Sequence, residues 1–206
     1  AGEEDGHCFL AMELIQGESL AARMAAVRGP LPLDEVLRIV GGVAAALDYA
    51  HREDILHRDV KPGNILLADD GRVVLTDFAM AQATSEPLAE ATLTGLSLGT
   101  PAYMSPEQVR GEPQDGRSDT YSLAVVTYAM LAGFQPFQRT NLAAVLRAVI
   151  ETAPADLSLV APDVPAGMAR AVQRGLAKTP ADHFSSAGQF AAALERGATG
   201  EDVSEE

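Results

Sequence analysis

The sequence has little of what several protein classes require. Its single cysteine, Cys8, excludes an internal disulfide and fits a reducing compartment. There is no tryptophan, and aromatic residues make up only 5% of the chain. Only two of its 15 basic residues are lysines, Lys61 and Lys178. No stretch reads as a signal peptide, and no apolar run is long enough to span a bilayer. These absences argue against a disulfide-rich secreted protein and against a membrane-spanning segment within this chain.

The charge balance is strongly acidic. Aspartate and glutamate number 29, which gives a formal net charge of −14 at pH 7. A chain of this charge is repelled by nucleic-acid backbones and anionic membranes, so neither is an expected partner of this segment. Hydrophobic residues make up 47% of the 206 residues, enough for one globular domain with a substantial core. We expect a cytoplasmic segment, with any membrane anchor of a parent protein lying outside this chain.

Strand patterns occur near the start and in the middle of the chain. His7 to Leu14 is one apolar run and predicts a strand, and Gln16-Gly17-Glu18 after it predicts a turn. Two short apolar runs, 65–67 and 73–75, flank Asp69-Asp70-Gly71. An Asp-Gly turn between such runs predicts a β-hairpin.

Helical periodicity dominates the rest, for example where Val36, Val40 and Val43 recur at steps of three and four. Six helices are expected, at 20–27, 33–50, 119–132, 142–150, 166–176 and 187–194. Candidate N-caps precede three of them: Ser19, Thr140 and Ser185. The segment 79–109 lacks periodicity, and irregular loops of that length are usually functional. The predicted fold is mainly α with a small β-hairpin.

The residues with the clearest chemistry lie around this hairpin. Asp59 and Lys61 place a proton acceptor beside a cation in an irregular loop. Asn64 and Asp77 offer oxygen ligands of the kind that hold Mg²⁺. Because they stand at the outer ends of the two hairpin strands, they should lie close together. A base, a cation and a divalent-ion site are the parts that phosphoryl transfer needs.

Five ordered motifs resemble the eukaryotic-like (Hanks-type) serine/threonine protein kinases of bacterial type. They are His57-Arg58-Asp59-Val60-Lys61-Pro62-Gly63-Asn64, Asp77-Phe78-Ala79, Gly99 to Glu107, Ser118 to Leu123, and Phe9 to Ile15. The resemblance covers nearly the whole chain. It implies a kinase-like large C-terminal lobe, with the small lobe reduced to its last strand. On this basis residues 1–15 would be that strand and the hinge, 16–196 the large lobe, and 197–206 an acidic tail or the start of a linker.

The resemblance also implies roles for individual residues, with ATP and Mg²⁺ as cofactors and Ser/Thr-containing proteins as substrates. Asp59 would orient or deprotonate the substrate hydroxyl, and Lys61 would steady the phosphoryl group. Lys61 together with Thr100 points to serine/threonine rather than tyrosine substrates. Asn64 and Asp77 would hold Mg²⁺. The residues expected around the nucleotide are Met12, Glu13, Ile15, Ser19 and Leu66.

Regulatory and structural roles follow in the same way. Arg58 beside Asp59 implies control by phosphorylation of the irregular segment 79–109, in which Thr92 and Thr94 form a Thr-x-Thr pair. The alternative is that these are ordinary loop threonines. Structural roles are implied for five residues: His57, Phe78, Glu107, Asp119 and His183. The spacing of His51 and His57, with no matching acidic or cysteine pattern, argues against a zinc site.

The sequence departs from the family pattern in three ways. No glycine-rich loop precedes the hinge, and no lysine is left to pair with the ATP phosphates, so the chain alone is expected to be inactive. Ala79 replaces a glycine, and His183 stands where an arginine usually pairs with Glu107. Two other functions stay open at this point. One is a pseudokinase or scaffold without phosphotransfer, and the other is an acidic helical interaction domain.

Overall fold

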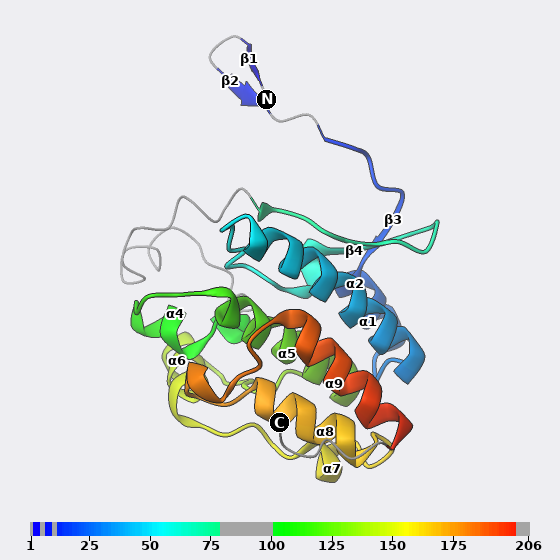
Figure 1. Ribbon diagram of the computed structural model, residues 1–206, viewed down its shortest axis with the longest axis vertical. Coiled ribbons are helices and arrows are strands. Elements are labelled where there is room, and N and C mark those ends of the chain that lie inside the picture. The colour runs from blue at the N-terminus through cyan, green and yellow to red at the C-terminus, as the bar shows by residue number, and fades with distance from the viewer. Residues whose placement is uncertain (1, 5–6, 10–11, 79–100, 201–206) are drawn as a thin grey trace.

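The computed structural model describes residues 2–4, 7–9, 12–78 and 101–200 (Figure 1). Ala79, Thr92, Thr94 and Thr100 therefore lie outside the described residues, as do residues 79–100 of the predicted irregular segment and residues 201–206 of the predicted tail. The described part is a body of helices with a small sheet along one side, which agrees with the predicted fold class.

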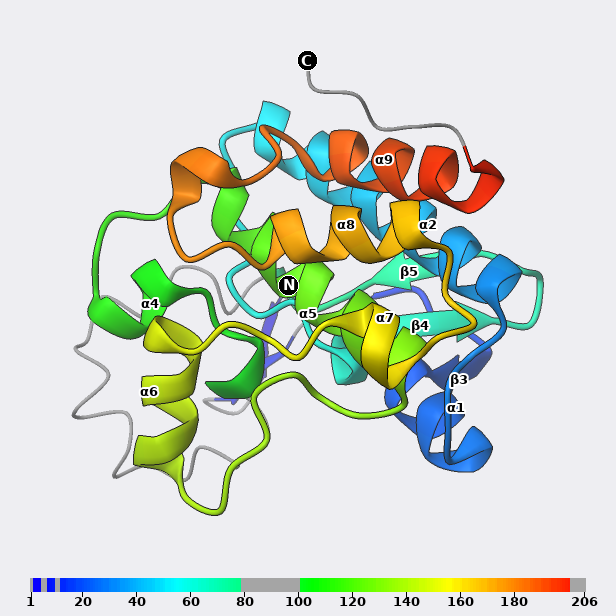
Figure 2. The same cartoon turned by 90° about the horizontal axis from the view of Figure 1, so that it is seen from below.

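The body is organised around one central helix, α5 (Gly116–Ala132). All of its residues from Ser118 onward are buried, so the apolar run there is a core helix. Helices α2 (Leu33–Arg52) and α8 (Ala166–Gly175) pack against α5, and α9 (Ala187–Thr199) packs against all three (Figure 2). The predicted helices 33–50, 166–176 and 187–194 are confirmed, the last extended through Thr199.

Shorter elements fill the ends of the body. The short α-helices are α1 (Leu20–Val27), α4 (Pro106–Arg110), α6 (Leu142–Glu151) and α7 (Leu157–Val160). The 3₁₀ turns are η1 (Pro62–Asn64), η3 (Pro101–Tyr103) and η4 (Pro180–Asp182). Helices α1 and α6 were predicted. The short elements α4 and η3 were not, because the sequence around them has no apolar period. None of the described helices combines the length with the apolar composition that a membrane span requires.

Side-chain caps explain where several helices begin. Ser19 caps α1 as predicted, because its Oγ accepts a hydrogen bond from Ala22 N at 3.2 Å. The other two predicted caps are wrong by one residue. Asn141 rather than Thr140 caps α6, and Ser186 rather than Ser185 caps α9. In each case the residue directly before the first turn is the one whose side chain reaches the free N–H three residues on.

The sheet has three antiparallel strands in the order β3-β4-β5. The predicted hairpin is confirmed as β4 (Ile65–Ala68) and β5 (Val73–Leu75). The turn predicted over Gln16-Gly17-Glu18 is wrong, because residues 17–19 form β3 (Gly17–Ser19) and pair with β4. A Cβ on Gly17 would lie 2.1 Å from the carbonyl oxygen of Leu67. Only glycine therefore permits this pairing.

The N-terminal strand differs from its prediction. Strand β2 (His7–Phe9) pairs antiparallel with β1 (Gly2–Glu4), and the strand does not continue to Leu14. This hairpin stands apart from the helical body in Figure 1. Met12 and Leu14 are 68% and 84% exposed. A single strand is not stable without a neighbour to pair with, and the strand that pairs with β2 is β1, directly before it in the chain.

Helices α8 and α9 approach closely through two glycines. A Cβ on Gly197 would lie 2.4 Å from the carbonyl carbon of Gly167 and 2.5 Å from Met168 N. Both of those atoms belong to the backbone, so neither can move aside easily. The contact sets the separation of the two helices.

Candidate active site

A buried carboxylate binds the backbone at the start of the irregular segment 57–61. Asp119, on α5 and 1% exposed, accepts hydrogen bonds from His57 N at 2.8 Å and from Arg58 N at 2.7 Å. Arg58 has a φ of 65°, in the left-handed region that non-glycine residues rarely adopt. The bond to its N–H helps to hold that conformation. Asp119 therefore lies where the sequence analysis expected a structural anchor.

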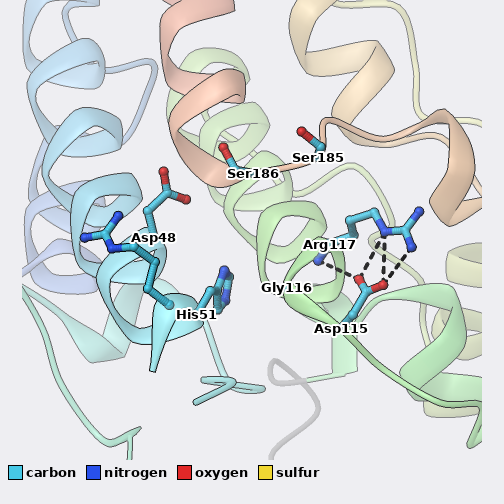
Figure 3. A pocket seen from close by; sticks show the side chains of 8 residues that line it. Asp48, His51, Asp115, Gly116, Arg117, Ser185 and Ser186 are labelled. Carbon is cyan, nitrogen blue, oxygen red and sulfur yellow. Dashed lines mark hydrogen bonds and ion pairs between the residues drawn. The ribbon is translucent and has the colours of Figure 1, made fainter. Parts of the chain in front are cut away.

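His51, at the end of α2, also binds this carboxylate, a partner that sequence reasoning missed. Its Nε2 lies 2.8 Å from Asp119 Oδ2. No local pattern indicates this contact, because Asp119 lies 68 residues further along the chain. His51 also lines a cavity of about 420 Å³ between α2 and the starts of α5 and α9 (Figure 3). The opposite wall of that cavity carries the Asp115–Arg117 ion pair.

His57 joins the segment 57–61 to the end of β5. Its Nδ1 accepts from Asp59 N at 3.2 Å, so its Nε2 carries the proton that is donated to Thr76 O at 2.8 Å. The ring is fully buried and packs edge-on against Phe78, with centroids 4.6 Å apart. Both of its nitrogens are used in holding backbone. This geometry suits a structural residue rather than a general base.

Asp59 gathers the charged and polar side chains of the loop. Its Oδ2 accepts from Lys61 Nζ at 2.6 Å and from Asn64 Nδ2 at 3.0 Å. Asn64 Nδ2 also donates to the Asp59 carbonyl at 2.9 Å. The carboxylate is about one quarter exposed, so a substrate could reach it. Three of the residues expected to carry chemistry therefore meet at one point, with Asp59 Oδ1 left to accept a further hydrogen bond.

The hairpin brings the residue before Asp77 into contact with Asn64. Thr76 N and Thr76 Oγ1 donate to Asn64 O at 2.9 and 3.2 Å, which ties the start of β4 to the residue before Asp77. Asp77 is exposed and, like Arg58, has a left-handed φ, here 68°. Strained backbone of this kind concentrates at functional sites.

The donor set fits a magnesium ion that is held partly by phosphate. The amide nitrogen of Asn64 is occupied, so its Oδ1 and the Asp77 carboxylate are the oxygens left to bind a cation. No cluster of three or more His, Cys, Asp or Glu suited to a metal occurs in the described residues. Mg²⁺ commonly takes one or two protein oxygens and completes its shell with water and substrate phosphates, so two side chains suffice.

A short helix ties the loop to the segment after residue 100. Ser105 and Gln108 form a capping box at the start of α4, and Gln108 Nε2 also donates to Arg58 O at 2.9 Å. Sequence reasoning missed Gln108. The Ser-x-x-Gln pattern could have indicated the cap, whereas nothing local indicates the contact with Arg58.

Glu107 and His183 are both buried but do not hydrogen-bond each other. Glu107 Oε1 accepts from Ser118 Oγ at 2.5 Å, and His183 Nε2 lies 2.7 Å from Ala177 O. Within the part of the chain that the structure describes, Glu107 Oε2 and His183 Nδ1 have no hydrogen-bond partner. In place of a direct pair between residue 183 and Glu107, Glu107 is therefore held by Ser118, and His183 by the carbonyl group of Ala177. An imidazole is shorter than a guanidinium and does not present its two-pronged fork.

The residues expected around a nucleotide are exposed or half-buried. Met12 and Glu13 are exposed, and Glu13 Oε1 accepts from Arg72 Nη2 at 3.0 Å. Ile15 is half-buried. Ser19 pairs with Leu66 across β3 and β4, and both are half-buried. The Ser19 hydroxyl already caps α1, so a contact with a ribose would have to share it.

Comparison with known proteins gives a consistent result. The family model described as "Protein kinase domain" matches residues 1–179. The serine/threonine-protein kinase PknL of Mycobacterium tuberculosis is 40% identical over 194 residues, which cover 94% of this chain and 48% of PknL. PknF of the same organism is 36% identical over 198 residues, which cover 94% of this chain and 41% of PknF. The chain thus spans about half the length of these curated relatives.

Comparison with solved structures also finds a protein kinase domain. The crystal structure of a mutant of the M. tuberculosis PknI kinase domain superposes with a TM-score of 0.73 at 36% identity. The match covers 96% of this chain and 68% of that one.

Proposed function

The chain belongs to the protein kinase domain family, and from that premise we propose that it supplies the large lobe of a serine/threonine kinase that transfers the γ-phosphoryl group of ATP to protein hydroxyls. The meeting of Lys61 and Asn64 on one carboxylate oxygen of Asp59 carries the proposal. Family members use ATP and Mg²⁺, and this segment would work in the cytoplasm, where ATP is available.

In the proposed mechanism Asp59 receives the substrate hydroxyl on Oδ1. Its Oδ2 is held by two donors, so the carboxylate cannot rotate freely and Oδ1 is presented in one direction. Lys61 lies within 2.6 Å of the carboxylate and adds a positive charge where a phosphoryl group would carry negative charge. Positioning and charge stabilisation of this kind are most of what a kinase contributes to rate.

Asn64 Oδ1 and Asp77 would hold Mg²⁺, which neutralises phosphate charge when bound. Met12, Glu13, Ile15 and Leu66 would meet the adenine, and Ser19 the ribose. Met12 and Glu13 are exposed, so these residues do not enclose a nucleotide by themselves. Kinase activity is therefore proposed for a longer protein that supplies the covering side, and little or none is expected of residues 1–206 alone.

We also propose that Arg58, beside the catalytic Asp59, receives a phosphate carried by Thr92 or Thr94. A phosphothreonine adds about −1.5 to −2 charge and would pair with a guanidinium. The Gln108–Arg58 bond would let that pairing act on the segment after residue 100.

The test is phosphate transfer from radiolabelled ATP to a protein substrate by the longer protein. Asp59→Asn keeps the shape of the side chain and removes its charge, so transfer should fall by at least about a hundredfold. The exposed Asp163→Asn is the matched control and should leave the rate unchanged. Equal rates in the two variants would refute the role of Asp59. Absence of transfer in the unmutated longer protein would refute the proposed function.

A further inference from the structure

The peptide group that joins Arg58 to Asp59 is held at both of its polar atoms. Its carbonyl oxygen, on Arg58, accepts a hydrogen bond from Gln108 Nε2 at 2.9 Å. Its N–H, on Asp59, donates to His57 Nδ1 at 3.2 Å. Because a peptide group is planar, bonds to both of these atoms fix its orientation. The direction in which the Asp59 side chain leaves the backbone is fixed with it.

Arg58 depends on partners outside its own segment. Its φ of 65° is one that non-glycine residues rarely adopt, and such a conformation persists only where the surroundings hold it. Asp119 on α5 holds the N–H of Arg58 at 2.7 Å, and Gln108 on α4 holds its carbonyl group. Removal of the Gln108 contact would leave the end of Arg58 that leads into Asp59 without its partner from α4.

The side-chain amide of Gln108 has a separate task at each end. Its Oε1 accepts from Ser105 N at 2.8 Å and completes the capping box of α4. Its Nε2 donates to Arg58 O. The oxygen faces an N–H and the nitrogen faces a carbonyl oxygen, so the two partners define which way the amide points. Only the contact with Arg58 needs an N–H donor.

We propose that Gln108 is a positioning residue through which α4 sets the orientation of the Asp59 carboxylate. Its action is indirect, because its bond is to the backbone of Arg58 and not to the carboxylate itself. The expected effect on phosphate transfer rests on the proposed function. The effect on the backbone at Arg58 and Asp59 does not.

Gln108→Glu separates the two tasks. Glutamate serves the third position of a capping box as well as glutamine does, so the midpoint of thermal unfolding should change by no more than about 2 °C. The variant has no N–H for Arg58 O and places a second oxygen against it. In the longer protein kcat should fall about tenfold, because small misplacements of reacting groups are costly. The KM for ATP should change by less than about twofold, since Gln108 is not among the residues proposed to meet the nucleotide.

Two further variants make the result specific. Gln173→Glu, at an exposed position of α8, is the same chemical change and should leave both kcat and the midpoint as they are. Ser105→Ala removes the hydroxyl that accepts from Gln108 N but keeps Ser105 N for Gln108 Oε1. It should lower the midpoint by about 3 °C and change kcat by less than about twofold. The two α4 variants should therefore show opposite effects on stability and rate.

Equal kcat values for Gln108→Glu and Gln173→Glu would overturn the inference. It would also be overturned if the midpoint of Gln108→Glu fell as far as that of Ser105→Ala, because the loss of rate would then follow from a weakened helix.

Hydrogen exchange of the 206-residue chain tests the contact without catalysis. Gln108→Glu should speed exchange of the Asp59 N–H about fivefold, and Gln173→Glu should not change it. If the longer protein transfers no phosphate but exchange rises in Gln108→Glu alone, the proposed function fails and the positioning contact stands. If the longer protein transfers phosphate while Gln108→Glu alters neither exchange nor kcat, the proposed function stands and this inference fails.

Discussion

Replacing Asp119 by asparagine should destabilise the fold and loosen the segment 57–61 together. The carboxylate accepts from two backbone N–H groups, on His57 and Arg58, and contacts His51. An amide of the same shape has one oxygen, so at least one buried N–H is left facing a donor. An orphaned buried donor costs about 1–3 kcal/mol, and the remaining bonds lose their charge assistance. We therefore expect the free energy of unfolding to fall by about 3 kcal/mol.

Circular dichroism in the far ultraviolet is the suitable assay, because the chain has no tryptophan to report on unfolding. A loss of about 3 kcal/mol in a domain of this size lowers the midpoint of thermal unfolding by about 8 °C. Asp163→Asn, an exposed position, makes the same chemical change and should shift the midpoint by no more than about 1 °C. Equal shifts in the two variants would show that Asp119 does not anchor the loop.

Two further predictions concern the core. Burial lowers the pKa of Lys178 to about 8 from 10.5, so between these values the unfolded chain holds a proton that the folded chain has lost. The difference in the free energy of unfolding between the unmutated chain and Lys178→Met, measured with urea, should therefore rise by about 1 kcal/mol from about pH 7 to 9.5. This figure is reduced because Lys178 is partly exposed. A difference that stays flat or falls with pH would contradict the prediction. Gly197→Ala should lower the free energy of unfolding by about 2 kcal/mol, because the added Cβ would meet the backbone of α8. Gly41→Ala in α2 should leave that free energy unchanged or raise it, because nothing lies within 4 Å of the added Cβ. Urea unfolding of both variants checks this, and equal destabilisation would show that the helix contact is not tight.

The parts of the fold that sequence could predict are those with a local signal. Helix α2 follows from valines at steps of three and four, and the β4–β5 hairpin follows from two apolar runs around Asp-Gly. The loop at Asp59 was recognisable because its chemistry is concentrated within eight residues. Its relation to Asp77 followed from the hairpin between them. Each of these depends on interactions between residues close in the chain.

The parts that sequence could not predict depend on distant partners. Strand β3 consists of Gly17, Glu18 and Ser19, which have no strand propensity, and it forms because β4 offers a free edge. His51 and Gln108 reach partners 68 and 50 residues away. No spacing rule links such pairs. For the same reason the separate anchors of Glu107 and His183 could be found only in three dimensions.

The left-handed backbone conformation of Arg58 and Asp77 lowers stability at two positions whose side chains have proposed functions. Each non-glycine residue held there costs about 1 kcal/mol that glycine would not. A selection for thermal stability alone would therefore enrich glycine at 58 and 77. At 77 it would remove a proposed magnesium ligand, and at 58 the side chain proposed to sense a phosphate. Variants improved for heat resistance should be sequenced at these two positions before their loss of activity is attributed to any other change.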